Sequence, residues 1–127
     1  MSKNQKNAII FIVIAVVLVV GYIYLNKEQR APGQLDSFAQ CLKDKGAIFY
    51  GAFWCPHCQN EKGFFGSSAR LLPYVECSTP DGNAQLPVCI QKKIQSYPTW
   101  EFSDGTRETG EVSLETLAEK TGCVLPK

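Results

Sequence analysis

The sequence predicts an α/β domain, with a central mixed sheet flanked by helices, preceded by one transmembrane helix. The apolar residues are unevenly spread: residues 8–25 form a stretch without a charge, and the rest of the chain alternates short apolar runs with segments of helical periodicity. With 127 residues, 45% of them hydrophobic and 20% charged, the chain has room for one ordinary globular domain. The net charge of +1 and the lack of a basic stripe argue against a nucleic-acid partner.

The stretch of residues 8–25 can cross a bilayer core of about 30 Å at about 1.5 Å per helical residue. Tyr22 and Tyr24 lie at its end, where interfacial aromatic residues belong. The alternative is a cleaved signal peptide, but such a peptide has a shorter apolar core followed by small residues, which residues 22–30 do not offer. The sequence therefore favours an uncleaved signal anchor.

The flanking charges indicate the orientation of this anchor. Lys3, Lys6 and the amino terminus precede it, whereas Lys27 and Arg30 follow it and are partly offset by a glutamate. The positive-inside rule then predicts that residues 1–7 are cytoplasmic and that the rest faces the periplasm, the cell exterior or a lumen. Six cysteines agree with this prediction, because an exported domain can keep disulfides.

Residues 26–34 are polar and contain Pro32-Gly33, so they are predicted to be a tether. Fully extended, they would reach roughly 30 Å, which keeps the predicted domain of residues 35–127 close to the membrane surface.

Within the domain, apolar periodicity, turn residues and helix caps predict seven elements. They are a helix over residues 35–45 ended by Gly46, a core strand over 47–53, a helix carrying Cys55 and Cys58 that runs through Glu61 and breaks before residues 67–72, a strand over 74–77, a helix from Pro87 to about residue 95, a hairpin of residues 99–102 and 106–109, and a helix capped by Ser113 and ended by Gly122.

The pair in Cys55-Pro56-His57-Cys58 stands where the core strand passes into a helix. Free backbone N–H groups and the helix dipole favour a thiolate there, and a second sulfur one turn on can resolve a mixed disulfide. We interpret the pair as a redox site, with Cys55 as the nucleophile and Cys58 as the resolving thiol. Two alternatives remain, namely half of a zinc site with Cys77 and Cys89 as the other half and His57 nearby, and purely structural cysteines in an anchored adaptor.

Four motifs in this order resemble the thioredoxin-like domain of bacterial vitamin K epoxide reductase homologues, over about residues 38–122. They are Tyr50-Gly-Ala-Phe-Trp-Cys-Pro-His-Cys58, Tyr74-Val-Glu-Cys77, Tyr97-Pro-Thr-Trp-Glu-Phe102 and Leu117-Ala-Glu-Lys-Thr-Gly122. In that family the domain is often fused to the reductase or acts as its partner. The resemblance therefore implies a thioredoxin-like fold and a separate, quinone-linked membrane reductase as the partner of this chain.

The resemblance also assigns roles to residues around the cysteine pair. Pro98 matches the proline that is cis in the thioredoxin fold and faces the active site. Pro56 and His57 occupy the positions that tune the redox couple, and the same Cys-Pro-His-Cys motif in DsbA-like oxidases suggests an oxidising protein. Trp54 and Tyr97 complete the predicted tuning and substrate-binding positions.

For the remaining cysteines, the resemblance suggests a second disulfide between Cys77 and Cys89, and Cys41 and Cys123 are left as a further pair. The sequence alone allows 15 connectivities for six cysteines.

One position departs from the thioredoxin pattern. Thioredoxins carry a buried acid six residues before the first active-site cysteine, and this chain has Phe49 there. The proton acceptor for Cys58 is therefore open between water, Glu61 and the substrate.

Taken together, these residues predict a membrane-anchored thiol-disulfide oxidoreductase without a metal, flavin or nucleotide cofactor. It would oxidise the thiols of exported proteins and pass the electrons to the vitamin K epoxide reductase-like partner. A reductase or isomerase would use the same scaffold, and a metal-binding module or metallochaperone is the alternative of another class.

Overall fold

The apolar stretch at the N-terminus forms a single long helix in the computed structural model, which describes residues 1–26 and 33–127. Helix α1 (Lys3–Asn26) is, within these residues, the one helix long and apolar enough to cross a membrane. Most of its apolar side chains are exposed, as suits a helix surrounded by lipid. It therefore fits a single-pass membrane anchor. The predicted tether lies for the most part outside the described residues.

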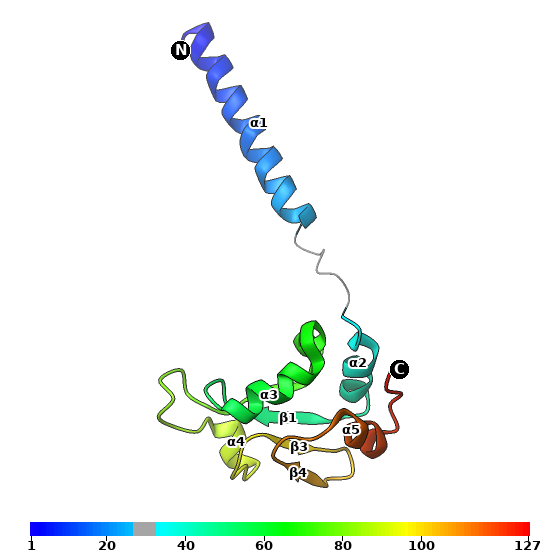
Figure 1. Ribbon diagram of the computed structural model, residues 1–127. Coiled ribbons are helices and arrows are strands. Elements are labelled where there is room, and N and C mark those ends of the chain that lie inside the picture. The colour runs from blue at the N-terminus through cyan, green and yellow to red at the C-terminus, as the bar shows by residue number, and fades with distance from the viewer. Residues whose placement is uncertain (27–32) are drawn as a thin grey trace. The chain divides into compact units, whose positions relative to one another are not determined.

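Residues 33–127 fold around a four-stranded mixed sheet (Figure 1). Its strands are β1 (Ile48–Gly51), β2 (Tyr74–Glu76), β3 (Thr99–Glu101) and β4 (Arg107–Thr109), in the spatial order β2-β1-β3-β4. Strand β1 runs parallel to β2 and antiparallel to β3, and β3 pairs with β4 as a hairpin. A mixed sheet flanked by helices confirms the predicted fold class, and it is consistent with a thioredoxin-like fold.

The centre of the core lies on β1. Phe49 is fully buried, stands opposite Tyr74 on β2 and opposite Trp100 on β3, and stacks on the Trp100 indole at 4.9 Å between ring centroids. The aromatic pair buries a large apolar area where the strand is covered on both faces. Phe38 and Leu42 of helix α2 (Asp36–Asp44) belong to the same core.

Helix α3 (Pro56–Phe65) follows β1 and ends at Gly66, whose φ of 53° takes the chain out of the helix. A 3-10 helix, η1 (Gly66–Leu71), continues from there, so the break that the glycines predict is present. The guanidinium of Arg70 in η1 donates two hydrogen bonds of 2.6 Å to the carboxylate of Asp36 in α2. This bidentate ion pair joins η1 to α2 and holds the pKa of Asp36 well below its usual range.

Helix α4 (Pro87–Gln91) is shorter than the prediction, which extended it to about residue 95. Lys93 adopts a left-handed φ of 54°, and the N–H of Ile94 bonds to the carbonyl of Cys89. This turn allows Ile94 to be buried against Tyr50 and the Cys77–Cys89 disulfide. The predicted end was wrong because burial of Ile94, a tertiary effect, outweighs the local helical pattern.

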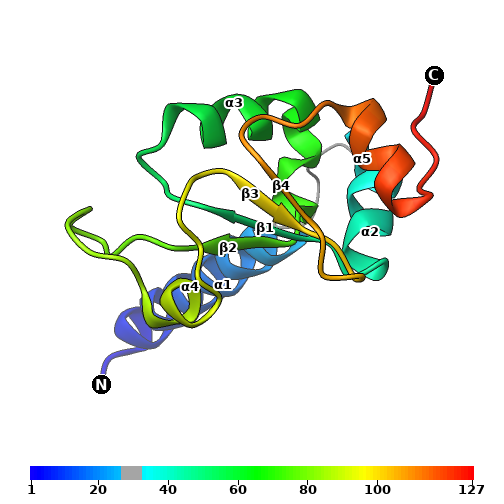
Figure 2. The same ribbon diagram turned by 90° about the horizontal axis from the view of Figure 1, so that it is seen from below.

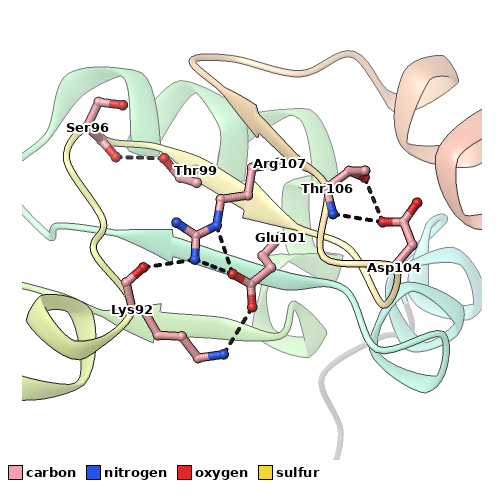
Figure 3. Close-up of polar contacts among 7 residues, drawn as sticks. All are labelled: Lys92, Ser96, Thr99, Glu101, Asp104, Thr106 and Arg107. Atoms are coloured by element: carbon pink, nitrogen blue, oxygen red, sulfur yellow. Dashed lines mark hydrogen bonds and ion pairs between the residues drawn. The ribbon is translucent and has the colours of Figure 1, made fainter.

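Polar contacts hold the hairpin at its turn end (Figure 3). Glu101 accepts from Arg107 across the hairpin and from Lys92, which follows α4, and Arg107 also donates to the Lys92 carbonyl at 2.8 Å. In the turn, Thr106 donates from its backbone and its hydroxyl to Asp104. These contacts connect the end of α4 to the edge of the sheet.

The last helix, α5 (Leu114–Thr121), begins with the predicted cap. The Ser113 hydroxyl accepts from the Thr116 N–H at 3.2 Å, and Gly122 closes the helix with a φ of 71°. Figures 1 and 2 both show α5 beside α2 at one end of the sheet, with the start of α3 and the loop of residues 77–86 at the other. The cysteine pair lies at this second end.

Candidate active site

Cys55 and Cys58 occupy the start of α3, directly after the turn that follows β1. Cys55 is the N-cap residue with an extended φ and ψ of −78° and 118°, and Pro56 takes the first helical position, where its missing N–H costs nothing. Both thiols are free. Cys55 retains 5% of its accessible surface and Cys58 none, so the sulfur of Cys55 is the one that a substrate can reach.

The environment of Cys58 keeps its proton in place. Burial raises the pKa of Cys58 to about 12, a contact with the backbone of Ala52 opposes the rise, and its hydrogen bond to Cys55 adds to it. Of the two sulfurs, the buried one therefore remains a thiol in the reduced state and donates to Cys55.

The loop before β3 forms the other wall of the site. The Tyr97–Pro98 peptide bond is cis, and the Tyr97 carbonyl lies 3.7 Å from the sulfur of Cys55. The Trp54 ring meets the Tyr97 ring edge to face at 6.1 Å, and its indole N–H donates to the Ser78 hydroxyl at 2.8 Å. Trp54 still exposes 51% of its surface, which leaves an apolar face beside Cys55.

The imidazole of His57 is held by a residue from a distant loop. Its Nδ1 lies 2.7 Å from Oε1 of Glu111, and the side-chain amide of Asn60 donates to the same oxygen at 3.1 Å. These hydrogen bonds from His57 and Asn60 lower the pKa of Glu111, so it is ionised at neutral pH. Sequence reasoning missed Glu111, because 54 positions separate it from His57.

The residue six positions before Cys55 is the buried Phe49, and the buried acid Glu61 lies on α3 instead. Glu61 is fully buried on α3, accepts from the Trp100 indole at 3.0 Å through one oxygen and from the Val112 N–H at 2.8 Å through the other. Burial raises its pKa, against the effect of these two donors. With both oxygens engaged, Glu61 joins α3 to β3 and to the loop before α5.

A second polar group lies beside Cys58 on the sheet. Gly51 has no side chain, and the point where its Cβ would stand is 3.0 Å from the Cys58 sulfur and 3.4 Å from the Tyr74 hydroxyl. That hydroxyl donates to Glu76 at 2.8 Å, and Glu76 also accepts from the N–H groups of Phe53 and Ser78. Apart from the polar residues in a strand, no pattern in the sequence indicated this group.

The other four cysteines form two disulfides. Cys77–Cys89 encloses the loop that contacts Trp54, and Cys41–Cys123 joins α2 to the segment after α5. Among residues 1–26 and 33–127, no three His, Cys, Asp or Glu side chains are grouped closely enough to hold a metal ion.

Comparison with known proteins relates the chain to a redox enzyme. No protein-family model matches it. It is 43% identical over 91 residues to a protein of Arabidopsis thaliana named thiol-disulfide oxidoreductase LTO1, and the alignment covers 68% of this chain and 24% of that protein. The chain thus spans about a quarter of the length of that relative. The similarity supports a role in thiol-disulfide chemistry.

Proposed function

We propose that this chain is a membrane-anchored thiol-disulfide oxidoreductase that acts through Cys55 and Cys58. The observation that carries the proposal is the placement of two free thiols at the start of α3, with the Cys55 sulfur 3.7 Å from the carbonyl before cis-Pro98. The name and identity of the Arabidopsis relative support the same chemistry.

The reaction begins from the Cys55–Cys58 disulfide. A substrate thiolate attacks the Cys55 sulfur, the bond between the two sulfurs of the pair breaks, and Cys58 leaves as a thiolate that takes up a proton. A second substrate thiolate then attacks the substrate sulfur of the mixed disulfide and releases Cys55. Two electrons and two protons thereby pass from the substrate dithiol to the pair, and the substrate gains a disulfide.

The burial of Cys58 suits its part in this sequence. Because its pKa lies at about 12, Cys58 binds a proton as soon as it leaves the disulfide, and it then donates a hydrogen bond to Cys55. The exposed faces of Phe53 and Trp54 offer an apolar surface next to the reacting sulfur, against which an unfolded substrate segment can pack. Pro56, Tyr97 and Pro98 are proposed to set the geometry of the couple and of the bound substrate.

We further propose the direction of electron flow and the partner. The substrates are exported proteins with free thiols, and a vitamin K epoxide reductase-like, quinone-linked membrane protein takes two electrons and two protons from the reduced pair. The anchor α1 and the resemblance described above support this partner, because an anchored domain would meet a membrane-embedded reductase and the domain that this chain resembles acts with such a reductase. Residues 1–7 would be cytoplasmic, and the domain would face the periplasm, the cell exterior or a lumen.

A reductase or isomerase is the second candidate, and the Glu111 carboxylate beside His57 favours it. A negative charge at this place weakens the stabilisation of a Cys55 thiolate by an imidazolium, and a less stable dithiol makes a weaker oxidant.

The reduction potential separates the two candidates. The full-length chain in detergent micelles is equilibrated in glutathione buffers, and the reduced fraction is read by alkylation of Cys55, with Cys55→Ser as the blank. A value near or above roughly −180 mV supports a disulfide donor, and one near roughly −270 mV supports a reductase. A pair that does not titrate in any buffer contradicts both.

A further inference from the structure

The loop between β4 and α5 is fixed against both walls of the site. The N–H of Gly110 donates to the Pro98 carbonyl at 2.9 Å, and the N–H of Val112 donates to the buried carboxylate of Glu61. Glu111 lies between these two anchored residues. Its carboxylate is therefore held in place next to the first turn of α3, where it contacts His57 and Asn60.

We infer that Glu111 is a positioning residue that withdraws the His57 imidazole from the Cys55 thiolate and so makes the Cys55–Cys58 pair less oxidising. The inference rests on the proposed function, since it concerns the potential of that pair. It is carried by the 2.7 Å contact between the Glu111 carboxylate and Nδ1 of His57, and by the fixed backbone on both sides of Glu111.

Two anions, the Glu111 carboxylate and the Cys55 thiolate, compete for one cation, the imidazolium of His57. An imidazolium near a thiolate stabilises it, and since the thiolate exists only in the reduced pair, this contact favours the dithiol and makes the disulfide a stronger oxidant. The same Nδ1–H cannot be donated to Glu111 and to Cys55 together. While the carboxylate holds the ring, the Cys55 thiolate lacks this donor.

A second effect has the opposite sign, because a carboxylate also favours the charged form of the histidine beside it. Both effects act through the same contact, and the geometry favours the competition, because the Glu111 oxygen lies 2.7 Å from Nδ1 and takes up this donor directly. The side chain of His57 is 68% exposed, which leaves the ring free to turn toward Cys55 once the carboxylate is removed.

The test compares full-length variants in detergent micelles at one fixed pH, in glutathione buffers in which two glutathione thiols deliver two electrons and two protons to the Cys55–Cys58 disulfide. Glu111→Gln keeps the shape of the side chain and removes its charge. Glu108→Gln is the matched control, since it breaks an ion pair of 2.8 Å with Lys120 away from the cysteines. His57→Ala and the double variant with Glu111→Gln complete a cycle.

Glu111→Gln is expected to shift the equilibrium toward the reduced pair by about two- to fivefold, the range for an exposed ion pair. This corresponds to roughly 9 to 21 mV more oxidising for a two-electron couple. Glu108→Gln is expected to leave the potential unchanged, and the effect of Glu111→Gln is expected to fall to less than half in the His57→Ala background.

Three results would overturn the inference: no shift in Glu111→Gln, a shift toward a more reducing pair, or an equal shift with and without His57. In each of them the wild-type chain still titrates, so they differ from failure of the proposed function, in which the wild-type pair does not titrate at all.

Discussion

Replacement of Gly51 by alanine tests how tightly the resolving cysteine is packed. Gly51 is the last residue of β1, and an alanine Cβ there would stand 2.9 Å from a ring carbon of Tyr74 and 3.0 Å from the Cys58 sulfur. Carbon atoms in contact prefer about 3.5 to 4.0 Å, so the methyl group overlaps both neighbours. Neither can move freely, because Cys58 is fully buried and Tyr74 bonds to Glu76.

The expected cost follows from this overlap. Extra volume in a packed core typically costs about 1 to 3 kcal/mol. Gly63 in α3 is the matched control, since no heavy atom other than those of its chain neighbours and of its own helix backbone lies within 4 Å of its Cβ position. Gly63→Ala should stabilise the domain by about 0.5 to 1 kcal/mol through helix propensity alone. The same chemical change should therefore have opposite signs at the two glycines.

The assay is equilibrium unfolding in urea of the full-length chain in detergent micelles, followed by tryptophan fluorescence. Both tryptophans of the chain, Trp54 and Trp100, lie in the folded domain, so α1 contributes no signal. Alkylation of Cys58 in the folded state is measured in parallel, and Gly51→Ala should accelerate it. A Gly51→Ala variant as stable as the wild type, with Cys58 equally protected, would refute the packing argument.

Further predictions concern the disulfide, the buried acid and the hydroxyl beside Cys58. Replacing both Cys41 and Cys123 by serine should lower the free energy of unfolding by about 2 to 5 kcal/mol, measured by the same urea titration, and a loss below about 1 kcal/mol would contradict it. Glu61 has a raised pKa, so it stabilises the fold most below its ordinary value of 4.5 and loses this contribution as the pH rises through the folded value. The unfolding free energy of the wild type minus that of Glu61→Gln should therefore fall from about pH 4 to pH 7, and a flat difference would be the contrary result. Tyr74→Phe removes the donor to Glu76 and should cost about 0.5 to 1.5 kcal/mol in the urea titration, whereas unchanged stability would show that the bond contributes nothing.

Elements with strong local signals could be predicted closely from the sequence. Ser113 and Gly122 mark the ends of α5 because a hydroxyl cap and a left-handed glycine are properties of single residues and their neighbours. The end of α4 was mispredicted, since it depends on the burial of Ile94 against residues far away in the chain. Local chemistry thus locates an element, and tertiary packing decides where it stops.

The position of the cysteine pair at the start of a helix could be predicted from the sequence, but the residues that surround the pair could not. Glu111 reaches His57 only because Gly110 and Val112 bind to two separate parts of the fold, and no spacing along the chain indicates this. Glu61 did leave a signal, because it falls on the same face of α3 as Cys58 and Phe65, which are buried. An acid at such a core-facing position predicts buried hydrogen-bond donors nearby.

The surroundings of Cys58 determine which group can take up its proton. Phe49 stands six residues before Cys55, where thioredoxins carry an acid, and it packs against Trp100. Both carboxylate oxygens of Glu61 accept hydrogen bonds, one from the Trp100 indole and one from the Val112 N–H. Transfer of a proton from Cys58 to Glu61 would therefore require breaking one of these buried hydrogen bonds and would leave its donor without a partner. Burial instead raises the pKa of Cys58 to about 12, and the hydrogen bond between Cys58 and Cys55 adds to this rise, so a change of charge at Cys55 alters how firmly Cys58 keeps its proton. The action that we infer for Glu111, which is to hold His57 away from Cys55, would therefore affect both cysteines at once.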